Sequence, residues 1–292
     1  MRIENDDLLT KLNQRYRSLS KGQKQLATYI LGNYDKAAFI TASQMGRMVG
    51  VSESTVVRFA YALGYDGYPE LQKSLQELIR NKLTSVQRIQ LSSAEMDQAN
   101  ILKSVLKADM QNIRSTIETI DNVAFNAAID VLLEAENVYI IGFRSASPLA
   151  QFLAYYLNFV RGNIILVNAF IGDAYEQMIR IGPKDVCVGI SFPRYSTRTL
   201  DAMSFAKNHS ASIIALTDGH ASPLAQMADF ALIARSDMAS FADSLVAPLS
   251  LINAVLVAAG LRCKDEISDR FDQLESIWGM QRVYLTRRPE DE

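Results

Sequence analysis

The chain has 292 residues, of which 49% are hydrophobic and 21% are charged, and its formal net charge is −2. These values are typical of an ordinary globular protein that is long enough for two domains. The polar start MRIENDDLLTKLNQRY lacks the apolar core of a secretory signal, and no run of 18 uncharged apolar residues follows it. We therefore expect a cytoplasmic protein with no membrane partner.

Charge is unevenly distributed along the chain. Residues 1–90 contain 13 Lys and Arg against 8 Asp and Glu, a balance of +5, which leaves 17 against 24, or −7, for the rest. A basic first third on an acidic body indicates a polyanionic partner for that third alone.

Helical patterns fill the first third. The predicted helices cover 5–16, 20–33, 43–49, 52–63 and a stretch from about Pro69 to Leu83. Ser20 and Ser43 are expected to be N-caps. The polar, aperiodic stretch 84–97 is typical of a linker. We expect an all-α domain over 1–83, a linker over 84–97 and a second domain over 98–292.

Strands and helices alternate in the second domain, after two helices over about 98–120 and 123–133. The predicted strands are 137–142, 163–168, 185–191, 211–218 and 229–234. The predicted helices between and after them are 147–160, 172–180, 196–208, a short one from Ser222, and 244–261. Continuously apolar strands that alternate with helices predict an α/β fold, with a five-stranded parallel sheet covered on both faces. Ligands bind such sheets at the carboxyl ends of the strands.

The stretch GVSESTVVRFAYALGY (50–65) has one apolar and one polar face. On a helix, Val56, Phe59, Ala60 and Leu63 form one stripe, while Ser54, Arg58 and Tyr61 lie opposite, with Thr55 at the edge. Met45, Met48 and Val49 of the preceding helix are expected to pack on the stripe. Gly46 permits a close approach of the two helices, and Gly50 fits a positive φ in the turn. Two helices joined in this way form a helix-turn-helix.

The polar face then predicts DNA binding. A recognition helix enters the major groove with its N-terminal residues, whose hydroxyls reach phosphates or base edges. Arg58 can contact guanine with two hydrogen bonds or hold a phosphate. The alternative is a small helical domain whose surface carries these residues for no such purpose. The predicted DNA-binding residues are Ser43, Gln44, Ser52, Ser54, Thr55 and Arg58.

Two loops that follow predicted strands are rich in hydroxyl groups: GFRSASPLA (142–150) and SFPRYST (191–197). Both lead into helices, whose N-terminal amides favour anions. The alternative is that these residues are only helix caps, for which Ser and Thr are the usual choice. Two such loops on one sheet favour a small-molecule cleft.

These loops resemble the sugar-isomerase (SIS) domain, which generally binds phosphosugars and shows G-x-G-x-S and S-x-S-G-x-[ST] after two of its strands. TDGHASPLAQMAD (217–229) also resembles its T-x-x-x-x-S-P-L-A-x-x-A-D stretch. A helix-turn-helix joined to such a domain resembles the RpiR-type transcriptional regulators. The resemblance covers residues 1–80 and about 120–262.

The chain departs from the family pattern at both loops. Arg144 and Arg194 stand where the family has glycine, Ala146 stands at the first-loop serine, and Pro193 stands at the middle serine of the second. We hypothesise that the two arginines clamp a phosphorylated or carboxylated sugar. The alternative is a remodelled or empty pocket. The predicted ligand-binding residues are Arg144, Ser145, Ser147, Ser191, Arg194, Ser196 and Thr197.

Catalysis has weaker support than binding. Sugar isomerisation needs a positioned general base, and His209, His220, Glu176 and Asp218 stand in no pattern that assigns such a role. Cys187 and Cys263 lack metal-ligand spacing and are expected to be reduced, buried thiols. IIGFRSAS has one glycine where a dinucleotide fingerprint needs three, so no cofactor and no metal are expected.

We expect a non-enzymatic regulator of sugar metabolism that binds operator DNA and responds to a sugar. One alternative is a phosphosugar isomerase with an accessory helical domain, and another is a sugar-binding scaffold. The family resemblance implies a homodimer or homotetramer, assembled through the sheet domain and the helices over 98–120 and 244–261. Two helix-turn-helix units would then bind a pseudo-palindromic operator.

Overall fold

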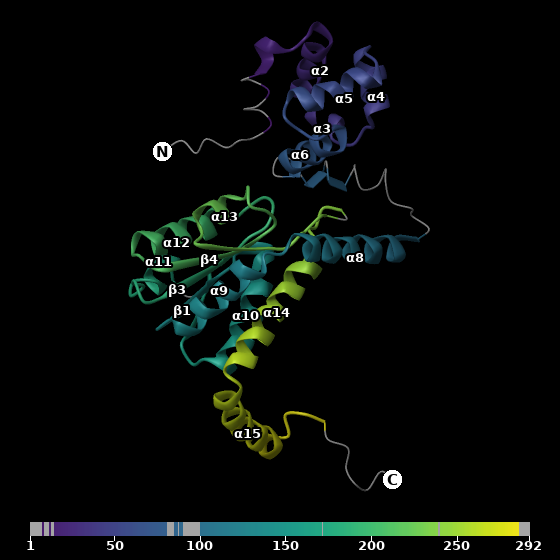
Figure 1. Ribbon diagram of the computed structural model, residues 1–292. Helices are drawn as coiled ribbons and strands as arrows, with labels where there is room; N and C mark the ends of the chain where they lie inside the picture. The colour runs from purple at the N-terminus through teal and green to yellow at the C-terminus, as the bar shows by residue number, and fades with distance from the viewer. Residues whose placement is uncertain are drawn as a thin grey trace. The chain divides into compact units, whose positions relative to one another are not determined.

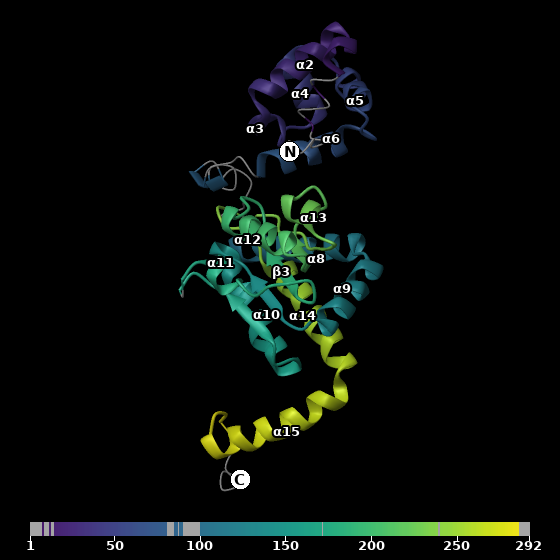
Figure 2. The same ribbon diagram turned by 90° about the vertical axis from the view of Figure 1, so that its left-hand side faces the viewer.

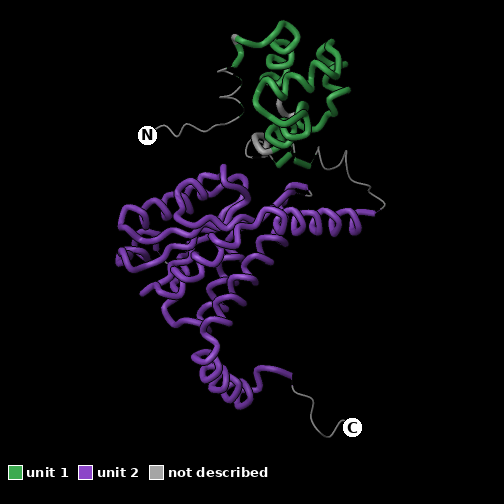
Figure 3. Tube along the Cα trace, in the orientation of Figure 1, with its two compact units in different colours: residues 1–95 green, residues 96–292 purple. Residues whose placement is uncertain are grey.

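The computed structural model describes residues 8, 12, 15–80, 85–86, 88–89, 100–170, 172–238 and 240–285. The chain divides into two compact units, residues 1–95 and 96–292 (Figure 3). The first unit is helical, and the second contains a sheet.

The helical unit contains α2 (Lys21–Gly32), α3 (Tyr34–Ala37), α4 (Ala42–Val49), α5 (Glu53–Ala62) and α6 (Tyr68–Arg80), preceded by the short 3₁₀ helix η1 (Tyr16–Ser18) (Figure 1). Helix α5 packs against α2, α4 and α6. Its neighbours contribute Leu26, Met45 and Leu71 to a fully buried core around Phe59.

The N-terminal and linker predictions need separate comment. Of the predicted helix 5–16, residues 8, 12 and 15 are described and helical, and most of the rest lies outside the described residues. In the predicted linker, residues 85, 86, 88 and 89 are described, and these four are helical rather than extended. The Arg88 side chain is buried. This part of the stretch therefore has structure of its own.

Helix caps explain where two of these helices begin. Ser20 caps α2 as predicted: its hydroxyl accepts from Gln23 N, and Gln23 Oε1 accepts from Ser20 N. The prediction that Ser43 caps a helix is wrong. Thr41 is the N-cap of α4, because Thr41 and Gln44 form the reciprocal pair of hydrogen bonds of a capping box. Ser43 instead lies in the first turn.

Tyr68 makes the helical unit sensitive to alkaline pH. Its hydroxyl donates to the Ile40 carbonyl oxygen at 2.7 Å. Burial, and secondly the neighbouring Tyr29, raises the pKa of Tyr68 from 10.0 to about 12. Because the folded-state pKa is the higher one, the associated stability is fully present below pH 10.0 and is lost as the pH rises through about 12.

We expect Tyr68→Phe to lower the free energy of unfolding at neutral pH by about 1 kcal/mol, through loss of that hydrogen bond. The difference between variant and wild type should shrink above pH 10.0. Denaturant unfolding followed by circular dichroism at several pH values measures both effects. A difference that stays constant up to pH 12 would show that Tyr68 ionisation does not contribute.

The second unit opens with α8 (Ile101–Thr119) and α9 (Asn122–Glu134). All five predicted strands are present, as β1 (Val138–Ile141), β2 (Ile164–Val167), β3 (Val186–Ile190), β4 (Ser212–Thr217) and β5 (Phe230–Ile233). They form one parallel sheet in the order β2-β1-β3-β4-β5. The fold-class prediction is therefore confirmed.

Helices cover both faces of this sheet (Figure 1). One face packs against α9, α10 (Ser147–Val160) and α14 (Val246–Arg262). The other packs against α12 (Thr197–Asn208), α13 (Pro223–Met227) and the region after the short α11 (Ala174–Gln177). Alternate residues of one strand serve the two faces: Ile140 belongs to the first core, and Tyr139 and Ile141 belong to the second.

A helix that was not predicted, α15 (Lys264–Gln281), follows α14. Among the described residues, no single helix is long and apolar enough to cross a membrane, although α14 and α15 pass that test as a pair bent by 100°. Cys263 lies at their junction and is only partly buried, so the prediction of two buried thiols holds for Cys187 alone. Burial raises the pKa of the Cys187 thiol to about 12.

Candidate functional sites

Helix α5 has the two faces that the sequence predicts. Val56, Phe59, Ala60 and Leu63 are each at most 1% exposed. Ser52 caps the helix, because its hydroxyl accepts from Thr55 N at 3.3 Å. The apolar stripe therefore fixes the orientation of the helix, and the opposite face is held outward.

Two glycines shape the turn between α4 and α5. A Cβ on Gly46 would lie 2.7 Å from the Val51 carbonyl oxygen, so the close approach of the helices needs glycine there. Gly50 ends α4 with a φ of 76°, in the left-handed region. Met45 is buried beneath the turn, but Met48 is 55% exposed, so its predicted packing on the stripe is wrong. Its sulfur accepts a hydrogen bond from the Tyr29 hydroxyl.

Ser54, Arg58 and Tyr61 form an exposed row along α5, at the i, i+4, i+7 spacing of one helix face. Arg58 Nε donates to the Ser54 carbonyl oxygen at 3.3 Å, which aligns the guanidinium with the helix. Thr55 is half-buried, and its hydroxyl lies 2.8 Å from that of Ser52. Of the predicted DNA-contacting residues on this helix, Ser54 and Arg58 thus face outward most fully.

Two of the other predicted DNA-contacting residues, Ser52 and Gln44, have structural partners. The Ser52 hydroxyl lies within hydrogen-bond distance of the hydroxyls of both Ser54 and Thr55. Gln44 Oε1 accepts from Thr41 N in the capping box. Ser43 and Gln44 are both exposed.

The start of α2 lies beside α5, which the sequence did not indicate. A Cβ on Gly22 would lie 3.4 Å from the Thr55 methyl group, and Gln23 Nε2 lies 3.5 Å from the Arg58 carbonyl oxygen. Lys21 and Lys24 follow on one face of α2 and line a surface groove with Tyr16. The sequence SKGQK carried the signal for this basic surface, because two lysines three residues apart follow the serine that caps the helix.

The two hydroxyl-rich loops leave the sheet from adjacent strands. Ile141, the last residue of β1, pairs with Gly189 in β3, so residues 142–147 and 191–197 emerge side by side at the carboxyl edge. From β1 the chain crosses to β2 on one side and then to β3 on the other. This reversal is a topological switch point, the place where ligands bind open α/β sheets.

Arg144 and Arg194 both adopt the left-handed backbone conformation, with φ values of 58° and 66°. Both side chains are exposed. This conformation costs a residue with a Cβ about 1–2 kcal/mol, a cost that glycine does not bear. Each loop thus keeps a backbone suited to glycine and yet carries a guanidinium group at that position.

The loop hydroxyls divide into two groups. Ser191 and Ser196 are buried: Ser191 Oγ accepts from Ser196 N at 3.0 Å, and Ser196 caps α12. The helix-cap interpretation therefore applies to Ser196. Ser145 and Thr197 are exposed, and partly buried Ser147 accepts from Gln151 Nε2 at 3.0 Å.

Tyr195 and Asp218 connect the second loop to the neighbouring strand. The Tyr195 hydroxyl donates to Asp218 Oδ1 at 2.8 Å, and Thr217 Oγ1 donates to the same oxygen at 3.2 Å. The Asp218 carboxylate is thus an anchor for the loop that carries Arg194. Sequence reasoning considered Asp218 as a possible base or a helix cap, and it did not single out Tyr195.

The remaining possible bases are exposed. Glu176 accepts from Asp173 N in the capping box of α11. His209 ends α12 and packs its ring against Phe205, with ring centroids 4.2 Å apart. His220 lies in the loop after β4. These contacts give Glu176 and His209 structural roles.

Comparisons with known proteins match both units. The family described as "Helix-turn-helix domain, rpiR family" matches residues 6–82, and the SIS domain matches residues 131–258. The Escherichia coli HTH-type transcriptional regulator HexR is 27% identical over 231 residues, which are 77% of this chain and 77% of HexR.

Two solved structures resemble the fold. The sugar isomerase domain of an RpiR transcription factor from Sphaerobacter thermophilus has a TM-score of 0.56 and 24% identity, and the match covers 59% of this chain and 96% of that one. Vibrio vulnificus NanR complexed with ManNAc-6P has a TM-score of 0.56 and 22% identity, and the match covers 93% and 98% of the two chains.

Proposed function

The chain belongs to the RpiR-type transcriptional regulators, with a helix-turn-helix unit and a SIS domain, and from that premise we propose that it binds operator DNA under the control of an anionic sugar. The observation that carries the DNA-binding half is the exposed row on α5 above a fully buried apolar stripe. A recognition helix needs this combination of outward donors and a fixed underside. Such a regulator acts where the chromosome is, in the cytoplasm.

Arg58 is assigned the base-reading role and the start of α2 the phosphate-contacting role. Base edges carry sequence information, whereas phosphate contacts set position and orientation. Gly22 and Gln23 hold the start of α2 next to α5. Lys21 and Lys24 add positive charge to the start of α2, beside Tyr16.

The sugar half of the proposal is carried by the two arginines at the switch point. Their adjacent loops, strained backbone and exposed guanidinium groups fit a clamp for a phosphate or carboxylate. Vibrio vulnificus NanR was solved with ManNAc-6P, a phosphosugar. We propose a phosphorylated or acidic sugar for this chain, held by Arg144 and Arg194 with the exposed hydroxyls of Ser145 and Thr197.

Helix α8 offers a physical link between the carboxyl edge of the sheet and the preceding linker. The Asn112 side chain makes two hydrogen bonds of 3.0 Å to the backbone of Asp237. Its Nδ2 donates to the Asp237 carbonyl oxygen, and its Oδ1 accepts from Asp237 N. Thr116 Oγ1 accepts from Arg235 N at 2.9 Å. A shift of the loop after β5 would therefore move α8, the first element of the second unit.

Two measurements together test the proposed function: a gel-shift titration with DNA and an assay for turnover of phosphosugars. We expect duplex DNA selected from a random library to bind tightly, with affinity that falls steeply with salt through counterion release. The effector should change that affinity about 5- to 150-fold, the range of coupling energies of 1–3 kcal/mol. Turnover of phosphosugars without any DNA binding would instead establish an isomerase.

A further inference from the structure

Residues 264–285, here called the arm, consist of α15 and the four residues after it. Of the 18 residues of α15, Ile267 alone is buried. A bend of 100° separates α15 from α14, and α15 leads away from the rest of its unit (Figure 2). Because an isolated helix of this length is marginal in water, the arm needs a packing partner.

The root of the arm is firmly attached. Arg270 Nη1 donates to the carbonyl oxygens of Phe159 and Val160, at 2.9 and 3.0 Å, and thereby caps the end of α10. The ring of Phe271 lies 5.7 Å from that of Phe159, measured between centroids. These contacts set the direction in which the arm leaves its own chain.

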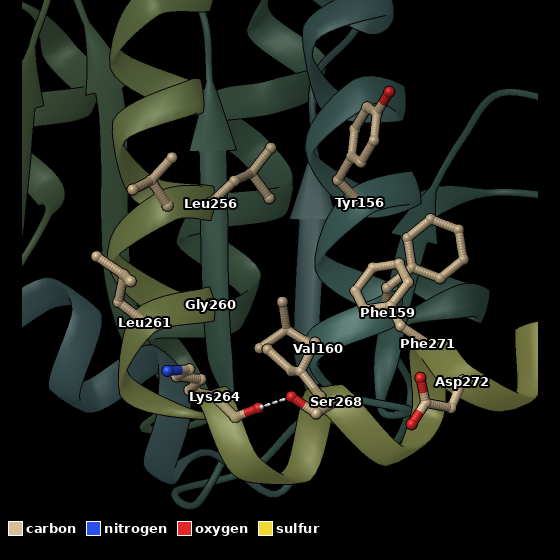
Figure 4. Close-up of a pocket in the computed structure, with 12 residues that line it drawn as sticks. Tyr156, Phe159, Val160, Leu256, Gly260, Leu261, Lys264, Ser268, Phe271 and Asp272 are labelled. Atoms are coloured by element: carbon tan, nitrogen blue, oxygen red, sulfur yellow. Dashed lines mark hydrogen bonds between the residues drawn. The ribbon is translucent and has the colours of Figure 1, made fainter. Parts of the chain in front are cut away.

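The bend leaves an apolar groove of about 550 Å³ between α10, α14 and α15 (Figure 4). Tyr156 and Phe159 line one side, and Leu256 and Leu261 line the other. Lys264 and Asp272 also line the groove and bring one charge of each sign. Two identical copies can therefore meet here without net like-charge repulsion.

Large apolar side chains are exposed on both the groove and the arm. In the groove the exposed fractions are 44% for Tyr156, 60% for Val257, 70% for Leu261 and 36% for Phe271. On the far part of the arm they are 48% for Ile277, 75% for Met280, 55% for Val283, 58% for Tyr284 and 106% for Leu285. At roughly 200 Å² for each fully exposed side chain, these residues present about 1,000 Å².

That area matches one partner's share of a stable protein interface, which is about 800 Å². One chain thus carries an apolar groove and an arm that exposes apolar side chains beyond the packing of its own Trp278 against Phe159 and Phe271.

We propose that the groove receives the arm of a second copy of this chain, and that a two-fold axis makes the exchange reciprocal. Each copy then covers the other's groove, so the same residues bury both unpartnered surfaces. This interface includes α14, which the family resemblance implied, and α15 and the far part of the arm, which were not predicted. It does not depend on the ligand or on DNA.

Three substitutions of equally exposed apolar side chains test the exchange. Met280→Asp charges the arm at a side chain 75% exposed, Leu261→Asp charges the groove at one 70% exposed, and Ile179→Asp changes a residue 71% exposed elsewhere on the unit. Light scattering coupled to size exclusion gives the particle mass of the full chain. The arm and groove variants should each halve the wild-type mass, whereas Ile179→Asp should leave it unchanged.

A mixture of the Met280→Asp and Leu261→Asp proteins distinguishes exchange from other contacts. Such a pair retains one intact arm facing one intact groove, so mixing should recover part of the larger particle. No recovery on mixing, a wild-type monomer, or an arm variant that dissociates while the groove variant does not, would each overturn the proposal. Circular dichroism should show all three variants folded, because the changed side chains are exposed.

Discussion

Replacing Arg58 with alanine is expected to abolish specific DNA binding and to leave sugar binding intact. A two-hydrogen-bond contact between arginine and guanine contributes about 1–3 kcal/mol of discrimination. A dimer on a two-fold operator makes that contact twice, so the loss is about 2–6 kcal/mol, or roughly 30- to 20,000-fold in affinity. Gel-shift titration with the selected duplex and a scrambled duplex measures it.

The stability of the Arg58→Ala protein should change little. The side chain is exposed, and its hydrogen bond to the Ser54 carbonyl oxygen is a surface contact, so the change should stay within about 0.5 kcal/mol. Lys73→Ala removes one positive charge from an exposed position on α6 and serves as a charge-matched control. Joint loss of DNA binding, sugar binding and thermal stability would show unfolding rather than a lost contact.

Lys21→Ala provides a contrast within the same interface. A phosphate contact carries no sequence information, so this variant should weaken binding to both duplexes equally. Because the dimer makes the contact twice, the salt dependence should fall by about two units of slope. Arg58→Ala should instead remove the difference between the duplexes. Equal effects of the two variants on both duplexes would contradict the roles assigned to α5 and α2.

The parts of the fold that sequence predicted are those governed by local periodicity. The spacing of Val56, Phe59, Ala60 and Leu63 fits one helix face, and all four are buried. The apolar strand runs were equally clear, because strands buried on both faces contain few polar residues. Gly50 was predictable since few other residues adopt a positive φ at low cost.

Three other features of the structure were not predicted from the sequence. Thr41 rather than Ser43 caps α4 because Gln44 is placed to complete a capping box. Ser196 was a ligand candidate, yet its hydroxyl caps α12. Helix α15 has many acidic residues and a single buried position, so its sequence lacks the apolar stripe of a helix that packs on its own chain.

The sequence and the fold do not by themselves explain why arginine stands at two backbone positions that favour glycine. Strain of this kind is retained where the surrounding structure or the function requires it. Arg194 lies on a loop that is anchored by the Tyr195–Asp218 hydrogen bond. The fixed backbone of this loop limits the positions that its guanidinium group can take. The side chain should therefore matter to the ligand more than to the fold.

Arg194→Ala is expected to weaken binding of the effector about 10- to 150-fold, since hydrogen bonds to a charged group contribute about 1.5–3 kcal/mol. Arg194→Gly should weaken binding as much and yet raise the free energy of unfolding by up to about 1 kcal/mol, because glycine relieves the strain at a φ of 66°. Calorimetric titration with phosphosugars and sugar acids, beside denaturant unfolding, measures the two effects.

Ser210→Gly separates strain relief from ligand binding. Ser210 has a φ of 64° and is exposed in the turn between α12 and β4. This variant should gain the same stability as Arg194→Gly and bind sugar like the wild type. If Arg194→Gly bound sugar as tightly as the wild type, the anion would be held by backbone amides, and the arginine clamp would be wrong. A gain in stability together with lost binding would instead show that the strained arginine is maintained for its charge.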